Sequence, residues 1–236
     1  MKNKLCKIRR GSLARLAPSL AAISAVTAWG MPGCSAVAAM APIEPYLMAS
    51  KEQEIALARS AAPASIANHA SVMVLDEHGY STAIKGTNEF VCLVVRSWDN
   101  DLDAKSGVFF NPKFHAPFCL NASGAQFELP VYLMRTQWVI AGASEKEMAA
   151  REKAAWAAGK LQEPKPGAMC YMMSRRGDLG AGPWHPHVMF YLPHEQAKSW
   201  GANLPSAPIT AVDGDHTTIF FVLVPFWSDG TPASRS

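Results

Sequence analysis

The sequence predicts an α+β fold, in which one domain combines a mostly antiparallel sheet of about six strands with an N-terminal helix and a helical hairpin packed on the sheet. Three observations lead to this prediction. Short apolar runs bounded by Gly, Asn and Pro are typical of strands. Two Ser-x-x-Gln/Glu capping boxes mark helix starts. The predicted helices fall in two groups instead of alternating with the strands, which favours antiparallel pairing.

The first residues have the composition of a cleavable export signal, which we predict to span residues 1–38. The first 40 residues hold six basic and no acidic side chains, and an apolar run ends in the small-residue cleavage pattern Ala36-Val37-Ala38. Two variants stay open: a twin-arginine route through Arg9-Arg10, and the less favoured lipoprotein cleavage before Cys34. We expect an exported protein, periplasmic or extracellular, with no transmembrane segment after signal removal.

The rest of the chain carries 16 Lys and Arg against 19 Asp and Glu, a formal charge of −3, although the whole chain is +3. The basic excess therefore belongs to the signal, and no basic block remains to bind nucleic acid. About 196 residues suffice for one domain with a substantial core. We predict an irregular leader over residues 39–49, a globular domain over 50–225 and a polar tail over 226–236.

The domain is predicted to open with a helix. Ser50 and Gln53 form a capping box that places this helix over residues 51–61, before Pro63. Three strands should follow as a meander, over residues 71–75, 80–85 and 89–96. The last of them is almost wholly apolar, which predicts a central strand covered on both faces.

Residues 97–125 are predicted to form a long loop, and loops of this length are usually functional or mobile. Asp99, Asp101 and Asp103 resemble the start of a calcium loop, but Phe110 stands where the bidentate glutamate is required. We therefore interpret them as a solvated acidic loop.

The helical hairpin is predicted next. Leu129-Pro130 should begin a helix that ends near residue 141, since Pro suits the first turn. Ser144 and Glu147 form a second capping box, with a helix to about residue 159. Further strands are expected over residues 168–174, 188–192 and 217–224, with a short helix over 194–200.

Three cysteines follow the signal: Cys92, Cys119 and Cys170. In an oxidising compartment one disulfide and one leftover thiol are expected, and the short loop favours Cys92 with Cys119. The alternative is that all three are buried small apolar residues. A nucleophilic role for Cys170 beside a histidine is disfavoured by its apolar flanks, which indicate burial.

The segment Trp184-His185-Pro186-His187 is the strongest candidate for a site. If it is extended, His185 and His187 point to the same face, as two ligands of a zinc or copper ion would. Further ligands could come from His194, Asp215 and His216. The alternative is a pair of histidines at a strand entry whose rings bond backbone carbonyls.

A cupin barrel also carries a His-x-His strand, but the glutamate expected about four residues after the second histidine is absent, with Tyr191 and Leu192 in its place.

Arg175 and Arg176 could bind an anion in a Gly-rich turn, and Trp184 could line a binding site. Four loop tryptophans are candidates for an exposed binding surface: Trp98, Trp184, Trp200 and Trp227.

Three segments carry a resemblance to a group of uncharacterised exported bacterial proteins: Gly86-Thr87-Asn88, residues 166–174 and residues 184–187. The resemblance covers most of the chain after the signal and implies an exported single domain, with no assigned activity. No complete catalytic motif is present. We therefore expect a module that binds a small ligand or an envelope partner. The alternatives are a metal-binding protein or metal-dependent enzyme using His185 and His187, and a structural or interaction protein of the cell envelope.

Overall fold

The computed structural model describes residues 43–99, 109–179, 184–194 and 197–233, all within one compact unit. The predicted export signal with Cys34, and two of the three loop aspartates, Asp101 and Asp103, lie outside the described residues. Within the described ranges, no helix is both long and apolar enough to cross a membrane.

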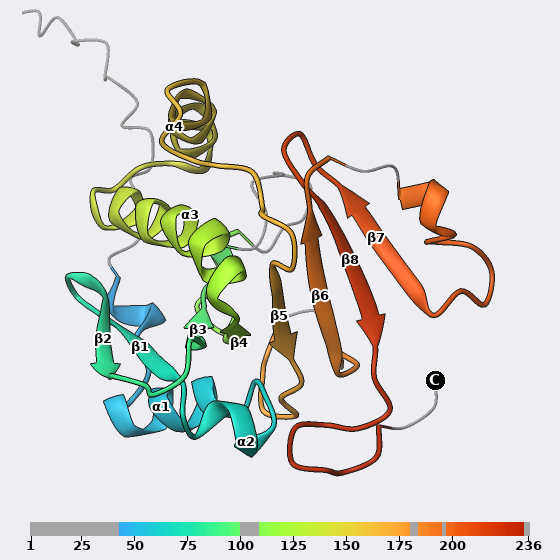
Figure 1. The fold of residues 1–236 in the computed structure, drawn as a ribbon. Helices are drawn as coiled ribbons and strands as arrows, with labels where there is room; N and C mark the ends of the chain where they lie inside the picture. Colours follow the sequence, from blue (N-terminus) through green and yellow to red (C-terminus); the bar gives the residue numbers. More distant parts are fainter. Residues whose placement is uncertain (1–42, 100–108, 180–183, 195–196, 234–236) are drawn as a thin grey trace, which may run out of the picture. The chain divides into compact units, whose positions relative to one another are not determined.

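Eight strands form one open sheet in the order β2-β1-β3-β4-β5-β6-β8-β7 (Figure 1). The strands are β1 Ser71–Asp76, β2 Gly79–Ile84, β3 Val91–Val95, β4 Ala116–Leu120, β5 Met169–Met172, β6 His187–Leu192, β7 Ile209–Asp213 and β8 Thr218–Leu223. The α+β class is confirmed, but the predicted six strands become eight, and the β1–β3 pair is parallel. Of the two added strands, β4 falls in the stretch that was predicted to be a long loop, and β7 falls where no strand was predicted.

The helices are η1 Glu44–Tyr46, α1 Lys51–Arg59, α2 Ala64–Ala67, η2 Ser97–Asp99, α3 Ala122–Ile140, α4 Glu145–Ala157 and η3 Ala197–Trp200. The three longest helices, α1, α3 and α4, begin at capping side chains. Ser50 accepts a hydrogen bond from the Gln53 N–H, which confirms the predicted start of α1. Both halves of the Ser144–Glu147 capping box are present. The predicted start of α3 is wrong: Asn121 caps it, and Pro130 lies inside the helix.

The predicted meander is also wrong, because β3 lies beside β1 and not beside β2. The connection crosses the start of β1 at Gly86, where a Cβ atom would lie 2.2 Å from the Ser71 nitrogen. Only glycine tolerates so close a backbone approach. Asn88 holds the crossing by donating to the Ile66 carbonyl at 2.9 Å and accepting from the Phe90 N–H at 3.0 Å.

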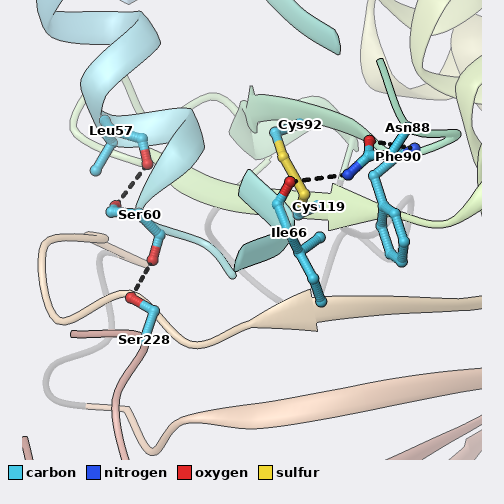
Figure 2. The surroundings of a disulfide bond; sticks show 8 residues. All are labelled: Leu57, Ser60, Ile66, Asn88, Phe90, Cys92, Cys119 and Ser228. Atoms are coloured by element: carbon cyan, nitrogen blue, oxygen red, sulfur yellow. Dashed lines mark hydrogen bonds between the residues drawn. A yellow bond between two sulfur atoms is a disulfide. The ribbon is translucent and has the colours of Figure 1, made fainter. Parts of the chain in front are cut away.

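The core lies on both faces of the central strands, so β3 is covered on both sides as predicted. On one face α1 contacts β1, β3 and β4, and on the other α3 contacts β2, β3, β4 and β5. Cys92 and Cys119 are direct register partners on β3 and β4 and form the predicted disulfide (Figure 2). Cys170 is free and buried.

The C-terminal segment, predicted to be a polar tail, packs against the domain. The Ser228 N–H donates to the Met173 carbonyl at 2.9 Å, and its hydroxyl donates to the Ser60 carbonyl at 2.6 Å (Figure 2). This segment therefore ties the end of α1 to the end of β5.

Strands β6, β8 and β7 extend beyond the main helices (Figure 1). Among the residues that the structure describes, the exposed large apolar side chains all fall between residues 190 and 226. They are Phe190, Trp200, Leu204, Val212, Leu223 and Phe226. This part of the sheet is where a binding surface can be sought.

Candidate functional site

The face of β6, β8 and β7 opposite α3 contains an apolar hollow of about 270 Å³. Six side chains line it, and we call it the apolar trough: Phe190, Leu192, Trp200, Ile209, Phe220 and Val222. Strand register explains the arrangement, because Phe190 lies opposite Phe220, and Val222 lies opposite Ile209. Side chains directly opposite on neighbouring strands share a face of the sheet.

Aromatic rings dominate the rim of the trough. Trp200 is 53% exposed and Phe190 is 39% exposed. The Trp200 ring leans on Phe220, with 4.9 Å between the ring centroids. No polar atom of the lining is exposed in the trough. The surface can therefore bind an apolar group, and it offers no acid, base or nucleophile.

One asparagine holds the wall of the trough in place. Asn203 follows η3, and its side-chain amide donates to the Ala211 carbonyl at 2.9 Å and accepts from the Ala211 N–H at 3.0 Å. Its own N–H donates to the Ile209 carbonyl at 3.1 Å. Asn203 adopts φ 62°, a left-handed conformation that asparagine tolerates better than most residues. The segment carrying Trp200 is thus fastened to the outer edge of β7.

Of the two predicted metal ligands His185 and His187, the structure places one on a strand. Strand β6 begins at His187, so His185 precedes the strand. The His187 Nδ1 lies 2.8 Å from the His185 carbonyl oxygen. This contact agrees with the alternative prediction, in which a histidine at the strand entry bonds to a backbone carbonyl. Burial lowers the pKa of His187 and so disfavours the charged form of its ring.

The other predicted ligands lie at the opposite end of β6. His187 pairs with Leu223, whereas Leu192 pairs with Thr218 beside the β7–β8 turn that carries Asp215 and His216. Five residues of strand separate the two ends by roughly 17 Å. Among the residues that the structure describes, no group of three or more His, Cys, Asp or Glu side chains could hold a metal ion.

The histidines at that end have structural contacts instead. His194 Nδ1 lies 2.9 Å from the Gly214 carbonyl oxygen. His216 stacks on Trp156 of α4 with 3.9 Å between centroids and 13° between planes. These contacts connect the β7–β8 turn to β6 and to α4.

The predicted anion-binding arginines also make structural contacts. Arg175 lies 3.8 Å from an Asp229 carboxylate oxygen, and Arg176 donates to the Ala56 carbonyl at 3.4 Å. Trp184 is half-buried, and its indole lies over Gly177. Of the four candidate tryptophans, Trp200 is the exposed one, whereas Trp98 is wholly buried.

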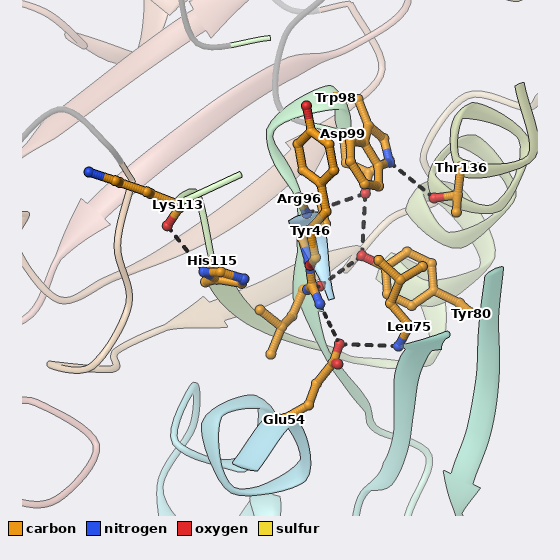
Figure 3. Close-up of polar contacts among 11 residues, drawn as sticks. Tyr46, Glu54, Leu75, Tyr80, Arg96, Trp98, Asp99, Lys113, His115 and Thr136 are labelled. Carbon is orange, nitrogen blue, oxygen red and sulfur yellow. Dashed lines mark hydrogen bonds and ion pairs between the residues drawn. The ribbon is translucent and has the colours of Figure 1, made fainter. Parts of the chain in front are cut away.

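Apart from the trough, the structure contains a buried polar cluster at the point where β1 and β3 separate (Figure 3). Arg96 is fully buried, and its guanidinium pairs with Glu54 at 3.0 Å and donates to the Tyr46 carbonyl at 2.9 Å. The same Glu54 oxygen accepts from the Leu75 N–H at 3.1 Å. Beyond Val72, where β1 no longer pairs with β3, these side chains replace the missing sheet hydrogen bonds.

Asp99 belongs to the same cluster, and it was predicted to lie in a solvated loop. It is only 4% exposed, with the Tyr80 hydroxyl 3.5 Å from its carboxylate. Burial raises the pKa of Asp99 to about 8, although Arg135 acts in the opposite direction. Its backbone carbonyl accepts from Arg135 at 2.9 Å. We interpret the cluster as structural, because its charged groups are used to join α1, β1, β3 and α3.

Sequence reasoning missed the trough. Val188, Phe190 and Leu192 alternate with Met189 and Tyr191, so both faces of β6 are apolar and the pattern predicts burial on both sides. The structure buries Met189 and Tyr191 but leaves Phe190 open. The sequence of β6 carries no signal that one of its faces is exposed, because exposure depends on which helices pack on the strand.

Comparison of the chain with protein-family models, with curated proteins and with solved structures finds no match. The site therefore has to be judged on its geometry alone.

Proposed function

We propose that the protein is a non-catalytic binding protein whose apolar trough takes an apolar group of a small ligand, such as a short alkyl chain or an aromatic ring. One observation carries the proposal: two exposed aromatic side chains, Phe190 and Trp200, border a hollow with an entirely apolar lining. Exposed apolar surface of this kind is costly in water and marks a binding site when it is contiguous.

The size of the trough limits the ligand. Its volume of about 270 Å³ lies near the lower end of ligand pockets, which run from about 300 to 1,000 Å³. A group that buries about 200 Å² of apolar surface gains about 5 kcal/mol before the cost of association. We therefore expect modest affinity for a single alkyl or aromatic group.

The proposal is tested by titration with the fluorescent apolar probe N-phenyl-1-naphthylamine. We expect probe emission to rise on binding and Trp200 emission to change with it. Phe190→Asp places a charge in the trough, which should weaken binding by about 10-fold or more, because an unpaired charge resists desolvation.

Val212→Asp is the matched control. Val212 is 59% exposed on β7, which also contributes to the trough, and its side chain lies on the other face of the sheet. Probe binding should be unchanged in this variant. Equal loss in both variants, or no saturable binding by the natural chain, would refute the proposal.

A further inference from the structure

The two edge strands of the sheet differ in whether their outward-facing backbone groups have hydrogen-bond partners. At β7, Asn203 occupies the outward-facing backbone groups of Ile209 and Ala211. At β2, no backbone hydrogen bond from the described residues reaches the outer edge. An open edge is a template for another strand, and most folds protect it.

The register of the β1–β2 hairpin shows which groups of β2 point outward. The Leu75 N–H donates to Glu54, away from β2, so Leu75 and its partner Tyr80 form a non-hydrogen-bonded pair. The N–H and C=O of Tyr80 therefore point to the outer edge. Thr82, opposite Met73, is two residues further on and repeats this orientation.

The composition of β2 offers little protection, although the register shift between Val72 and Met73 places a bulge at Ala83 near the end of the strand. The strand reads Gly79–Ile84 without a charged residue or a proline, and Ser81 and Thr82 are exposed. Charges stand only at its ends, with Glu77 in the hairpin turn and Lys85 just after the strand, both exposed. Opposite charges at opposite ends are complementary to a second, antiparallel copy of the same strand.

We propose that two copies of this chain pair through antiparallel β2 edges about a two-fold axis at Ser81. In this register Tyr80 of each copy faces Thr82 of the other, and all four residues present outward N–H and C=O groups. The turn that carries Glu77 of each copy then lies near the end of β2 that carries Lys85 of the other, with the bulge at Ala83 between Ser81 and Lys85. Two ion pairs can therefore flank the axis. The same patch serves both copies, as a two-fold interface requires.

The interface is small, so the dimer is weak. Four backbone hydrogen bonds and two exposed ion pairs give an association that is visible only at high protein concentration and weakens with salt. Sedimentation equilibrium over about 10 to 500 µM covers the range expected for an interface of this size.

Charge exchange tests the register. Lys85→Glu replaces both attractions by repulsions, and we expect the dimer dissociation constant to rise about 10-fold at low salt. Glu77→Lys should do the same. Combining Glu77→Lys with Lys85→Glu restores opposite charges across the axis and should return the constant to the natural value.

Asp215→Lys, a charge change of the same kind in the β7–β8 turn, is the control and should leave association unchanged. A chain that stays monomeric over the whole range, or a dimer for which the double exchange fails to rescue, overturns the proposal. A dimer abolished by Phe190→Asp also overturns it, because the trough would then be the interface. Probe binding at the trough is measured on the same variants and should not respond to the charges at β2, so the two proposals fail independently.

Discussion

At the scale of single residues, the most unusual environments are those of buried carboxyl groups. Burial raises the pKa of Asp99 to about 8 and that of Glu128 to about 7. Both groups hold a proton more tightly in the folded than in the unfolded chain. The contribution of these two bound protons to the free energy of unfolding is complete below pH 4 and is lost as the pH rises towards 8.

Asp99→Asn is expected to flatten this decline. Each carboxyl removes up to about 1.4 kcal/mol of unfolding free energy per pH unit within its window. The asparagine keeps the shape but cannot ionise, so the slope between pH 5 and pH 8 should fall to about half, with Glu128 supplying the remainder. Urea unfolding at several pH values measures the slope.

Asp215→Asn is the control, since Asp215 is exposed in the β7–β8 turn. Its pH profile should match that of the natural chain. An unchanged slope in Asp99→Asn would show that Asp99 is ionised in the folded state.

At the scale of helices and strands, the sequence predicted correctly the helix starts that depend on side chains close by in the chain. The capping side chains of Ser50 and Ser144 act within one helical turn, and both helix starts are confirmed. β4 was missed because Pro117 argues against a strand, yet Pro117 lies where β4 pairs with β3 alone. The trough was missed because its lining comes from three strands and η3, whose meeting depends on tertiary structure.

Asn203→Gly tests whether η3 depends on its fastening to β7. Glycine accepts φ 62° without strain but loses both side-chain hydrogen bonds to Ala211. We expect a loss of about 1 to 2 kcal/mol in local stability. Hydrogen exchange of the β7 amides should accelerate, and the trough should bind the naphthylamine probe less tightly.

Ser206→Gly is the matched control, because Ser206 also has φ 62° and lies in the same connection. It should leave exchange in β7 unchanged. Equal acceleration in the two variants would mean that backbone flexibility, and not the Asn203 amide, controls this edge.

At the scale of the whole molecule, the helices and the disulfide support the central strands, while β6, β8 and β7 extend beyond them. The sequence predicted the class, the central position of β3 and the cysteine pair. It could not predict the order of the strands, because the crossing at Gly86 is a close backbone contact that leaves no periodic signal.

Replacing both Cys92 and Cys119 by Ala should destabilise the whole domain. The two cysteines are 27 residues apart, and closing a loop of that length contributes about 3 to 4 kcal/mol in the chain-entropy description. Thermal unfolding under oxidising conditions should show a lower midpoint with a single transition. A midpoint equal to that of the natural chain would mean that the disulfide adds no stability.

The position of the third cysteine has a consequence for oxidative folding. Cys119 and Cys170 lie on neighbouring strands, but Cys119 packs beneath α1 and Cys170 packs beneath α3. The sheet itself therefore separates the free thiol from the disulfide. Thiol–disulfide exchange between them requires β4 and β5 to come apart. Mispairing is thus confined to the time before these two strands associate, and the native pair is protected once they have done so.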